Sequence, residues 1–196
     1  MLQFDVKSNI DQVARQLDSR FSRQVPFAAA RALTATAKEV QRAISDELPR
    51  IFDRPTPFTQ RGIGMTMATK ASLTSRVFIK DIQREYLQLQ VRGGLRTPKK
   101  RALVLPAEVG LNAYGNIPRS RLKTLLARKD VFSGRVRGVA GIWQRTGSGL
   151  KLLVAYEPKA TYEARFPFGL LAQRVIEKRL LPNFRASLAS AIASAR

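Results

Sequence analysis

The fold class of this chain is decided by residues 131–157, which read VFSGRVRGVAGIWQRTGSGLKLLVAYE. Strand-forming residues fill the segments 131–137, 139–145 and 150–157, and Thr146-Gly147-Ser148-Gly149 between the last two is a turn sequence. The stretch therefore predicts an antiparallel hairpin or meander. Trp143 lies in its second segment, where a large aromatic side chain is expected to pack in the core.

Helices are predicted on both sides of this β region. Pro26 suits the first turn of a long helix that Pro49 ends, and its apolar residues recur at helical spacing: Leu33, Ala37, Val40, Ile44 and Leu48. An earlier helix is expected from the Asn9 cap to Phe21. A C-terminal helix, interrupted or kinked at Pro182, is predicted from the spacing of Phe168, Leu171, Val175, Ile176, Phe184, Leu188 and Ile192.

Shorter elements are predicted between the long helix and the meander. Residues 52–59 contain two prolines and predict an extended connection, and residues 62–79 predict two strands. Residues 81–91 fit a strand or a helix, and we favour the helix. Residues 102–106 predict a short buried strand. Because helices flank the strands, we expect an α+β fold in a single domain, 1–196, with an N-terminal helical pair and a C-terminal helix packed on a mainly antiparallel sheet.

Positive charge is concentrated in the middle of the chain. The 196 residues carry a net charge of +21, and residues 92–137 hold twelve basic and two acidic side chains. Turn-forming and basic residues predict that residues 92–130 form a basic arm with little core potential, inserted in the domain. The residues predicted to contact a partner or DNA are Arg92, Arg96, Lys99, Lys100, Arg101, Arg119, Arg121, Lys123, Arg128, Lys129, Arg135 and Arg137.

The composition argues against an enzyme. The sequence has no histidine and no cysteine, so the commonest general base, the thiol nucleophile and the commonest zinc ligands are missing. Glu157 and Glu163 lie near Lys159 and Arg165, and surface ion pairs explain them better than an acid–base site does. We expect no catalytic residues, no cofactor and no metal.

No apolar run approaches the roughly 18–20 residues that span a bilayer, and the first residues do not resemble a signal peptide. We therefore expect a protein that is made in the cytoplasm and has no membrane partner. A strongly basic protein binds nucleic acid or an acidic protein surface. Tyr114 is the only aromatic residue between Arg92 and Asp130, so stacking platforms for single strands are not evident, and protein docking is favoured over nucleic acid.

The segment 27–38, FAAARALTATAK, resembles the minor tail protein Z type of tailed bacteriophages and, more loosely, tail-component neck proteins. The specific similarity covers roughly residues 20–50, and the order of strands and C-terminal helix extends it to the end of the chain. Neck-type relatives carry a Glu-x-Gly-Thr segment and a later proline- and phenylalanine-containing motif, of which only Phe166-Pro167-Phe168 has a counterpart here.

The resemblance implies a structural virion protein that forms a homo-oligomeric ring in the tail or neck, near the head–tail junction. Its expected partners are copies of itself and other virion proteins, namely the connector, the tail tube or the tail terminator. The basic arm would then dock on acidic neighbours, with packaged DNA as a further contact. The alternative is a basic nucleic-acid-binding protein of phage or bacterial origin.

Overall fold

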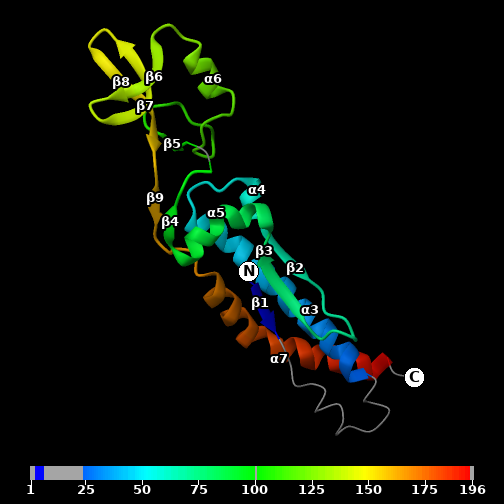
Figure 1. Ribbon diagram of the computed structural model, residues 1–196. Helices are drawn as coiled ribbons and strands as arrows, with labels where there is room; N and C mark the ends of the chain where they lie inside the picture. The colour runs from blue at the N-terminus through cyan, green and yellow to red at the C-terminus, as the bar shows by residue number, and fades with distance from the viewer. Residues whose placement is uncertain (1–2, 7–23, 100, 195–196) are drawn as a thin grey trace.

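Two long antiparallel helices run the length of the larger of two lobes, which we call the body (Figure 1). They are α3 (Gln24–Ile51) and α7 (Phe168–Ser194) in a computed structural model that describes residues 3–6, 24–99 and 101–194. Cross-links between them fix the antiparallel order: Arg31 donates to Ser190 (3.4 Å), and Asn183 donates to Thr36 (3.0 Å). The alanines of α3 that are buried and allow α7 to approach closely are Ala28, Ala29, Ala32 and Ala37.

A three-stranded antiparallel sheet completes the body with two short helices. The strands are β1 (Gln3–Val6), β2 (Ile63–Thr66) and β3 (Ser75–Ile79), in the order β1-β3-β2. The helices are α4 (Pro57–Gln60) and α5 (Asp81–Arg92). The body core contains Ile44 and Leu48 of α3, Val77 and Ile79 of β3, and Phe166 before α7.

A two-stranded ribbon, which we call the neck, joins the body to a second lobe. It consists of β4 (Gly94–Arg96) and β9 (Ala160–Tyr162), which pair antiparallel and lie side by side in Figure 1. The second lobe, called the distal lobe, contains β5 (Leu103–Pro106), α6 (Arg121–Leu126), β6 (Val131–Val136), β7 (Val139–Thr146) and β8 (Gly149–Glu157). Its sheet has the order β5-β8-β7-β6.

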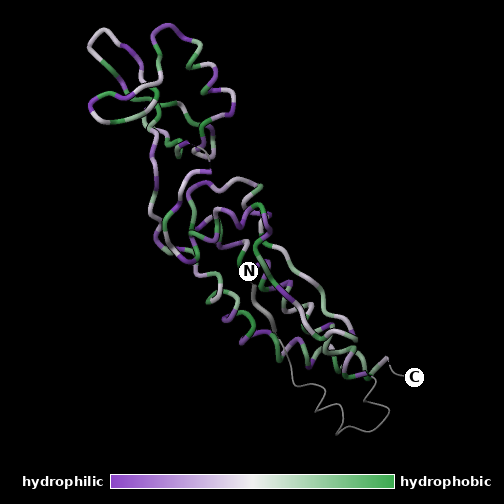
Figure 2. The backbone as a smooth tube through the Cα atoms, viewed as in Figure 1, coloured by the Kyte–Doolittle hydropathy of each residue, from purple (hydrophilic) through white to green (hydrophobic). Residues whose placement is uncertain are grey.

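The distal lobe has a hydrophobic core of its own. The core comprises Val109, Leu125, Val131, Ile142, Leu153 and Val154. Hydrophilic segments, purple in Figure 2, recur around the loops of this lobe. The prediction that the basic arm has little core potential was wrong, because Val109 and Leu125 are buried against the meander that follows. The single domain stays a prediction, and the described contacts show two cores joined by the neck.

The predicted α+β class is confirmed, with the long N-terminal helix, the meander and the helix over 81–91 in place. One predicted helix cannot be compared with the structure, and four other details differ. The helix predicted over 9–21 lies outside the described residues. Residues 57–60 form one helical turn, because Thr56 Oγ1 accepts from Thr59 N (3.2 Å) and Pro57 begins the turn. Gly94–Arg96 of the expected basic loop is a strand.

The other two differences concern burial and continuity. Residues 103–106 form a strand as predicted, but it is an exposed edge strand rather than a buried one. Both long helices continue past their prolines: α3 runs to Ile51, two residues beyond Pro49, which was expected to end it, and α7 runs through Pro182, which excludes the expected interruption but not a kink. Proline removes one N–H from the helix, yet Pro182 and Lys178, whose carbonyl loses its partner, are both exposed, so water can satisfy that carbonyl.

Candidate functional site

The structure divides the predicted basic residues into two groups. Around α6 in the distal lobe lie Arg119, Arg121, Lys123, Arg128 and Lys129, all exposed. The helix is held because Leu125 is buried in the distal core and Leu122 packs against that core, and this leaves the charged side chains on the outer side. Arg135 lies on β6, and Arg137 lies in the β6–β7 turn with φ 49°.

The remaining predicted residues lie at or near the neck. Arg92 ends α5, Arg96 is on β4, and Lys99 and Arg101 are in the segment leading to β5. Lys100 lies outside the described residues. The predicted arm is therefore not one contiguous surface, because its first ten residues belong to the neck and its later residues to the distal lobe.

Two of the predicted basic residues form ion pairs. Lys99 pairs with Glu85 (2.7 Å), and Arg128 pairs with Asp130 (2.6 Å). The pKa of Glu85 is lowered by its hydrogen bond to Lys99. The pKa of Asp130 is lowered mainly by its hydrogen bond to Arg128 and also by Gln144. The predicted residues of the distal lobe with no carboxylate partner in the described part of the chain are Arg119, Arg121, Lys123, Lys129, Arg135 and Arg137.

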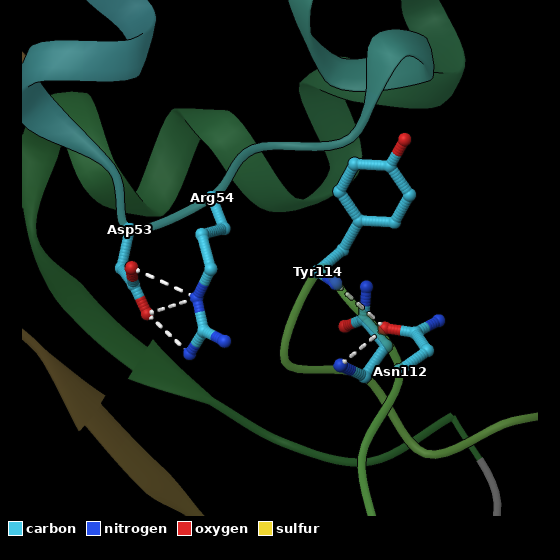
Figure 3. A network of polar contacts seen from close by, with 5 residues as sticks. Asp53, Arg54, Asn112 and Tyr114 are labelled. Carbon is cyan, nitrogen blue, oxygen red and sulfur yellow. Dashed lines mark hydrogen bonds and ion pairs between the residues drawn. The ribbon is translucent and has the colours of Figure 1, made fainter.

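A cleft of about 390 Å³ lies between the body and the distal lobe at the neck. The body contributes the loop after α3, and the distal lobe contributes the loop with Tyr114 (Figure 3). The Tyr114 loop is held by Asn112, whose Oδ1 accepts from the backbone N–H of Tyr114 and of Asn116 (both 3.0 Å). Gly115 in this loop has φ 70° and faces Arg54, so the loop needs glycine there.

Three arginines and three tyrosines line this neck cleft: Arg54, Arg96, Arg165, Tyr86, Tyr114 and Tyr162. Arg54 is paired with Asp53 (2.9 Å) and lowers the pKa of that carboxyl through its hydrogen bonds. Neutral groups hold the other two guanidinium groups. Arg96 Nη1 donates to Tyr162 Oη (3.3 Å), and Arg165 Nε donates to Gln90 Oε1 (2.6 Å). The Arg165 guanidinium also lies 5.2 Å from the ring centre of Phe52.

Sequence reasoning missed this cleft, although it identified Arg96. Arg54 and Arg165 are 111 positions apart in the chain, and only the fold brings them together. The expected surface pairing of Glu163 with Arg165 is not what the structure shows, because Arg165 donates to Gln90 instead. Aromatic residues are scarce near the basic residues in the sequence but not in the fold, because Tyr86 and Tyr162 line the same cleft as Tyr114.

Three exposed apolar side chains lie on the outer face of α7, with the charged residues Arg174, Glu177 and Arg185 between them. Leu170, Leu181 and Ile192 are 58%, 54% and 42% exposed. They are spaced by eleven residues, which is close to three helical turns, so they form one stripe of about 33 Å along the helix. Leu181 and Asn183 are 200° apart on the helix, and Asn183 bonds to α3. The α7 stripe therefore faces away from α3.

A shallow groove of about 490 Å³ lies on the opposite side of the body. Its floor is apolar, with Phe27, Ala30 and Ala35 of α3 and Met67 after β2, which is 74% exposed. The groove also includes Thr34, which is 200° around α3 from Thr36, the residue that bonds to α7. We call it the α3 groove. The body thus presents two apolar patches that face in opposite directions.

The two long helices are also joined by a polar cluster. Glu39 of α3 accepts hydrogen bonds from Arg179 and from Asn183 of α7 (3.1 Å to Asn183). The bond from Arg179 is the main cause of the lowered pKa of Glu39. This cluster sets the register of α3 against α7 and so fixes where the α7 stripe lies.

The described residues contain no group of three carboxylates that could hold a metal ion. None of the helices in the described ranges is both long and apolar enough to cross a membrane. Trp143 is half-buried rather than part of the core, and its Nε1 has no hydrogen-bond partner among the described residues. No family model, no curated protein and no solved structure matches the chain.

Proposed function

We propose that this protein is a non-catalytic structural subunit of a tailed-phage virion, assembling as a homo-oligomeric ring in the tail or neck. The observation that carries the proposal is the pair of apolar patches on opposite sides of the body. A ring requires a heterologous interface, in which one surface of each subunit contacts a different surface of the next. The α7 stripe of one copy and the α3 groove of another supply two such surfaces.

The hydrophobic effect favours this contact over exposure of the two patches to water. Burial of apolar surface contributes roughly 25 cal/mol per Å², so covering Leu170, Leu181, Ile192 and Met67 would contribute several kcal/mol per interface. Large apolar side chains that gather on an exposed surface are typical of a surface that a partner covers. The bacteriophage class rests on the resemblance of residues 27–38, and the ring would place the distal lobe and its basic surface near other virion proteins.

Light scattering coupled to size-exclusion chromatography tests the assembly, together with negative-stain electron microscopy of the same fractions. We expect a concentration-dependent oligomer of the purified protein with closed rings in the images. Leu181→Glu and Met67→Glu should each convert the oligomer to a monomer. Ile82→Glu is the matched control, because Ile82 is exposed on α5 outside both patches. A monomer at all concentrations, or equal dissociation by Ile82→Glu, would contradict the ring.

Nucleic-acid binding is the second candidate, favoured by the six predicted basic side chains of the distal lobe that lack carboxylate partners among the described residues. Each phosphate contact would add about −0.9 to the slope of log K against log salt concentration. Anisotropy of a labelled duplex at increasing salt measures that slope. Failure to bind the duplex at low salt would exclude this function, whereas a slope of several units that Lys123→Gln with Lys129→Gln reduces would support it.

A further inference from the structure

The neck has a strand edge that no part of the described chain covers. β4 pairs with β9 on one side only, and the ribbon contains no third strand. Gly94, Leu95 and Arg96 are all exposed, and none of their backbone groups has another partner in the described part of the chain. Such an edge presents unpaired N–H and C=O groups that another extended chain can pair with.

Pockets of different chemistry lie beside this edge. The neck cleft contains Arg96 and Arg165. A second groove of about 580 Å³ lies along α5, β4 and β5; it includes the apolar residues Leu89, Leu95 and Leu103, and Arg96 lines both this groove and the neck cleft. Because successive side chains of a strand point to opposite faces, Leu95 and Arg96 project to opposite sides of the ribbon. A chain added to β4 would likewise present alternate side chains to the two faces.

The charge of the neck cleft selects the side chain it would take. Among the described residues, the only carboxylate that lines the cleft is Asp53, and it is paired with Arg54. Arg96 and Arg165 are held by Tyr162 and Gln90, which are neutral, so both guanidinium groups keep free donors and an uncompensated charge. A positioned guanidinium fork matches the geometry of a carboxylate. The cleft is therefore suited to an acidic side chain.

We propose that the neck binds an extended acidic segment of a partner protein, which adds as a strand to the free edge of β4. An acidic side chain of the segment binds Arg96 and Arg165 in the neck cleft, and an alternate apolar side chain packs on Leu95. A nucleic acid cannot form the backbone pairing that this edge offers, and a cleft of about 390 Å³ is too small for a duplex. The inference rests on the proposed function only for the identity of the partner as a virion protein.

The added strand would also have a mechanical effect. The neck is a two-stranded ribbon, and two strands alone are marginally stable in water. A third strand supplies further backbone hydrogen bonds at the point where the two lobes join. Binding of the segment would therefore restrain the distal lobe relative to the body.

The test uses the full chain and a fluorescein-labelled peptide in which Glu and Val alternate over seven residues. Fluorescence anisotropy at about 0.15 M salt should show binding. The same peptide with Gln in place of Glu should bind at least 10-fold more weakly, and one with alternate N-methylated amides should not bind. Arg96→Gln and Arg165→Gln should each weaken binding of the Glu peptide about 10-fold. Arg42→Gln, which removes the same charge from an exposed site on α3, should not.

Three results would overturn the proposal. The Gln peptide binding as tightly as the Glu peptide would exclude recognition of a carboxylate. Equal weakening by Arg42→Gln would assign the effect to overall charge. A single-stranded oligonucleotide that displaces the peptide from the unchanged protein, but does not bind Arg96→Gln, would show that the cleft binds nucleic acid. Peptide binding by a protein that stays monomeric would support the neck site and contradict the ring, so the two failures can be told apart.

Discussion

Gly141 should be essential for the distal lobe, and the geometry gives the size of the effect. It lies on β7 between Gly134 of β6 and Ala155 of β8. A Cβ atom added at this position would lie 2.2 Å from the Val154 carbonyl oxygen and 2.8 Å from a Leu152 methyl carbon. Since the closer atom belongs to the backbone, the two strands must separate to admit the methyl group. Overpacking of this kind typically costs about 1–3 kcal/mol, and we expect Gly141→Ala to cost about 3.

Urea unfolding followed by two probes measures this cost. Trp143 is the only tryptophan and lies two residues from Gly141, so its fluorescence reports on the distal lobe. Circular dichroism at 222 nm reports chiefly on α3 and α7 of the body. With a typical slope of about 2 kcal/mol per M, a loss of 3 kcal/mol lowers the fluorescence midpoint by about 1.5 M. The dichroism midpoint should change much less, because the distal core is separate from the body core.

Gly147→Ala is the matched control in the same lobe. An added Cβ there meets no atom within 4 Å, and its backbone does not have a positive φ that would exclude alanine. Its fluorescence midpoint should stay close to that of the unchanged protein. The packing argument is refuted if Gly141→Ala and Gly147→Ala unfold at the same urea concentration. Equal shifts of both probes in Gly141→Ala would refute the independence of the two cores.

Two further predictions concern the body. Phe166→Ala should lower the free energy of unfolding by about 3–5 kcal/mol and the melting temperature by roughly 8–15 °C. The reason is that the Phe166 ring is buried and makes edge contacts with the rings of Phe52 (5.7 Å) and Phe168 (5.9 Å). A decrease in melting temperature of less than 3 °C would contradict this packing. Arg179 lowers the pKa of Glu39 from its ordinary value of 4.5, so this carboxylate stabilises the folded state above pH 4.5 and the contribution is lost as the pH falls through the lowered value. Glu39→Gln should therefore reduce the amount by which the free energy of unfolding falls as the pH is lowered below 4.5. An unchanged fall in the free energy of unfolding would show that Glu39 does not contribute to it.

Local pattern was enough to predict most elements of this protein. Helical spacing of Leu33 to Leu48 identified α3, and alternation with a Gly-Ser-Gly turn identified the meander of β7 and β8. Both depend on which residues are neighbours on one element, and that information is contained in a short window of sequence. The α+β class followed from the order of these elements.

The packing of these elements against one another could not be predicted from short windows of sequence. Residues 92–130 were interpreted as an arm because basic and turn-forming residues recur through them, but Val109 and Leu125 complete a core whose other members come from residues 131–154. The burial of an edge strand depends on what covers it, and β5 has no cover on its outer side. The partner of Arg165 was misjudged because Arg165 donates to Gln90, which is 75 positions away in the chain, whereas Glu163, two positions away, was expected to pair with it.

The sequence by itself determined most of the secondary structure, the fold class and the concentration of positive charge, because propensity, periodicity and charge are properties of neighbouring residues. Only the tertiary structure decided how that charge is divided between the neck and the distal lobe. It alone brought Arg96 and Arg165 into one cleft and placed the α7 stripe opposite the α3 groove. The physical reason is that a binding surface depends on distances in space between residues that are far apart in the chain, and packing of the two cores sets those distances.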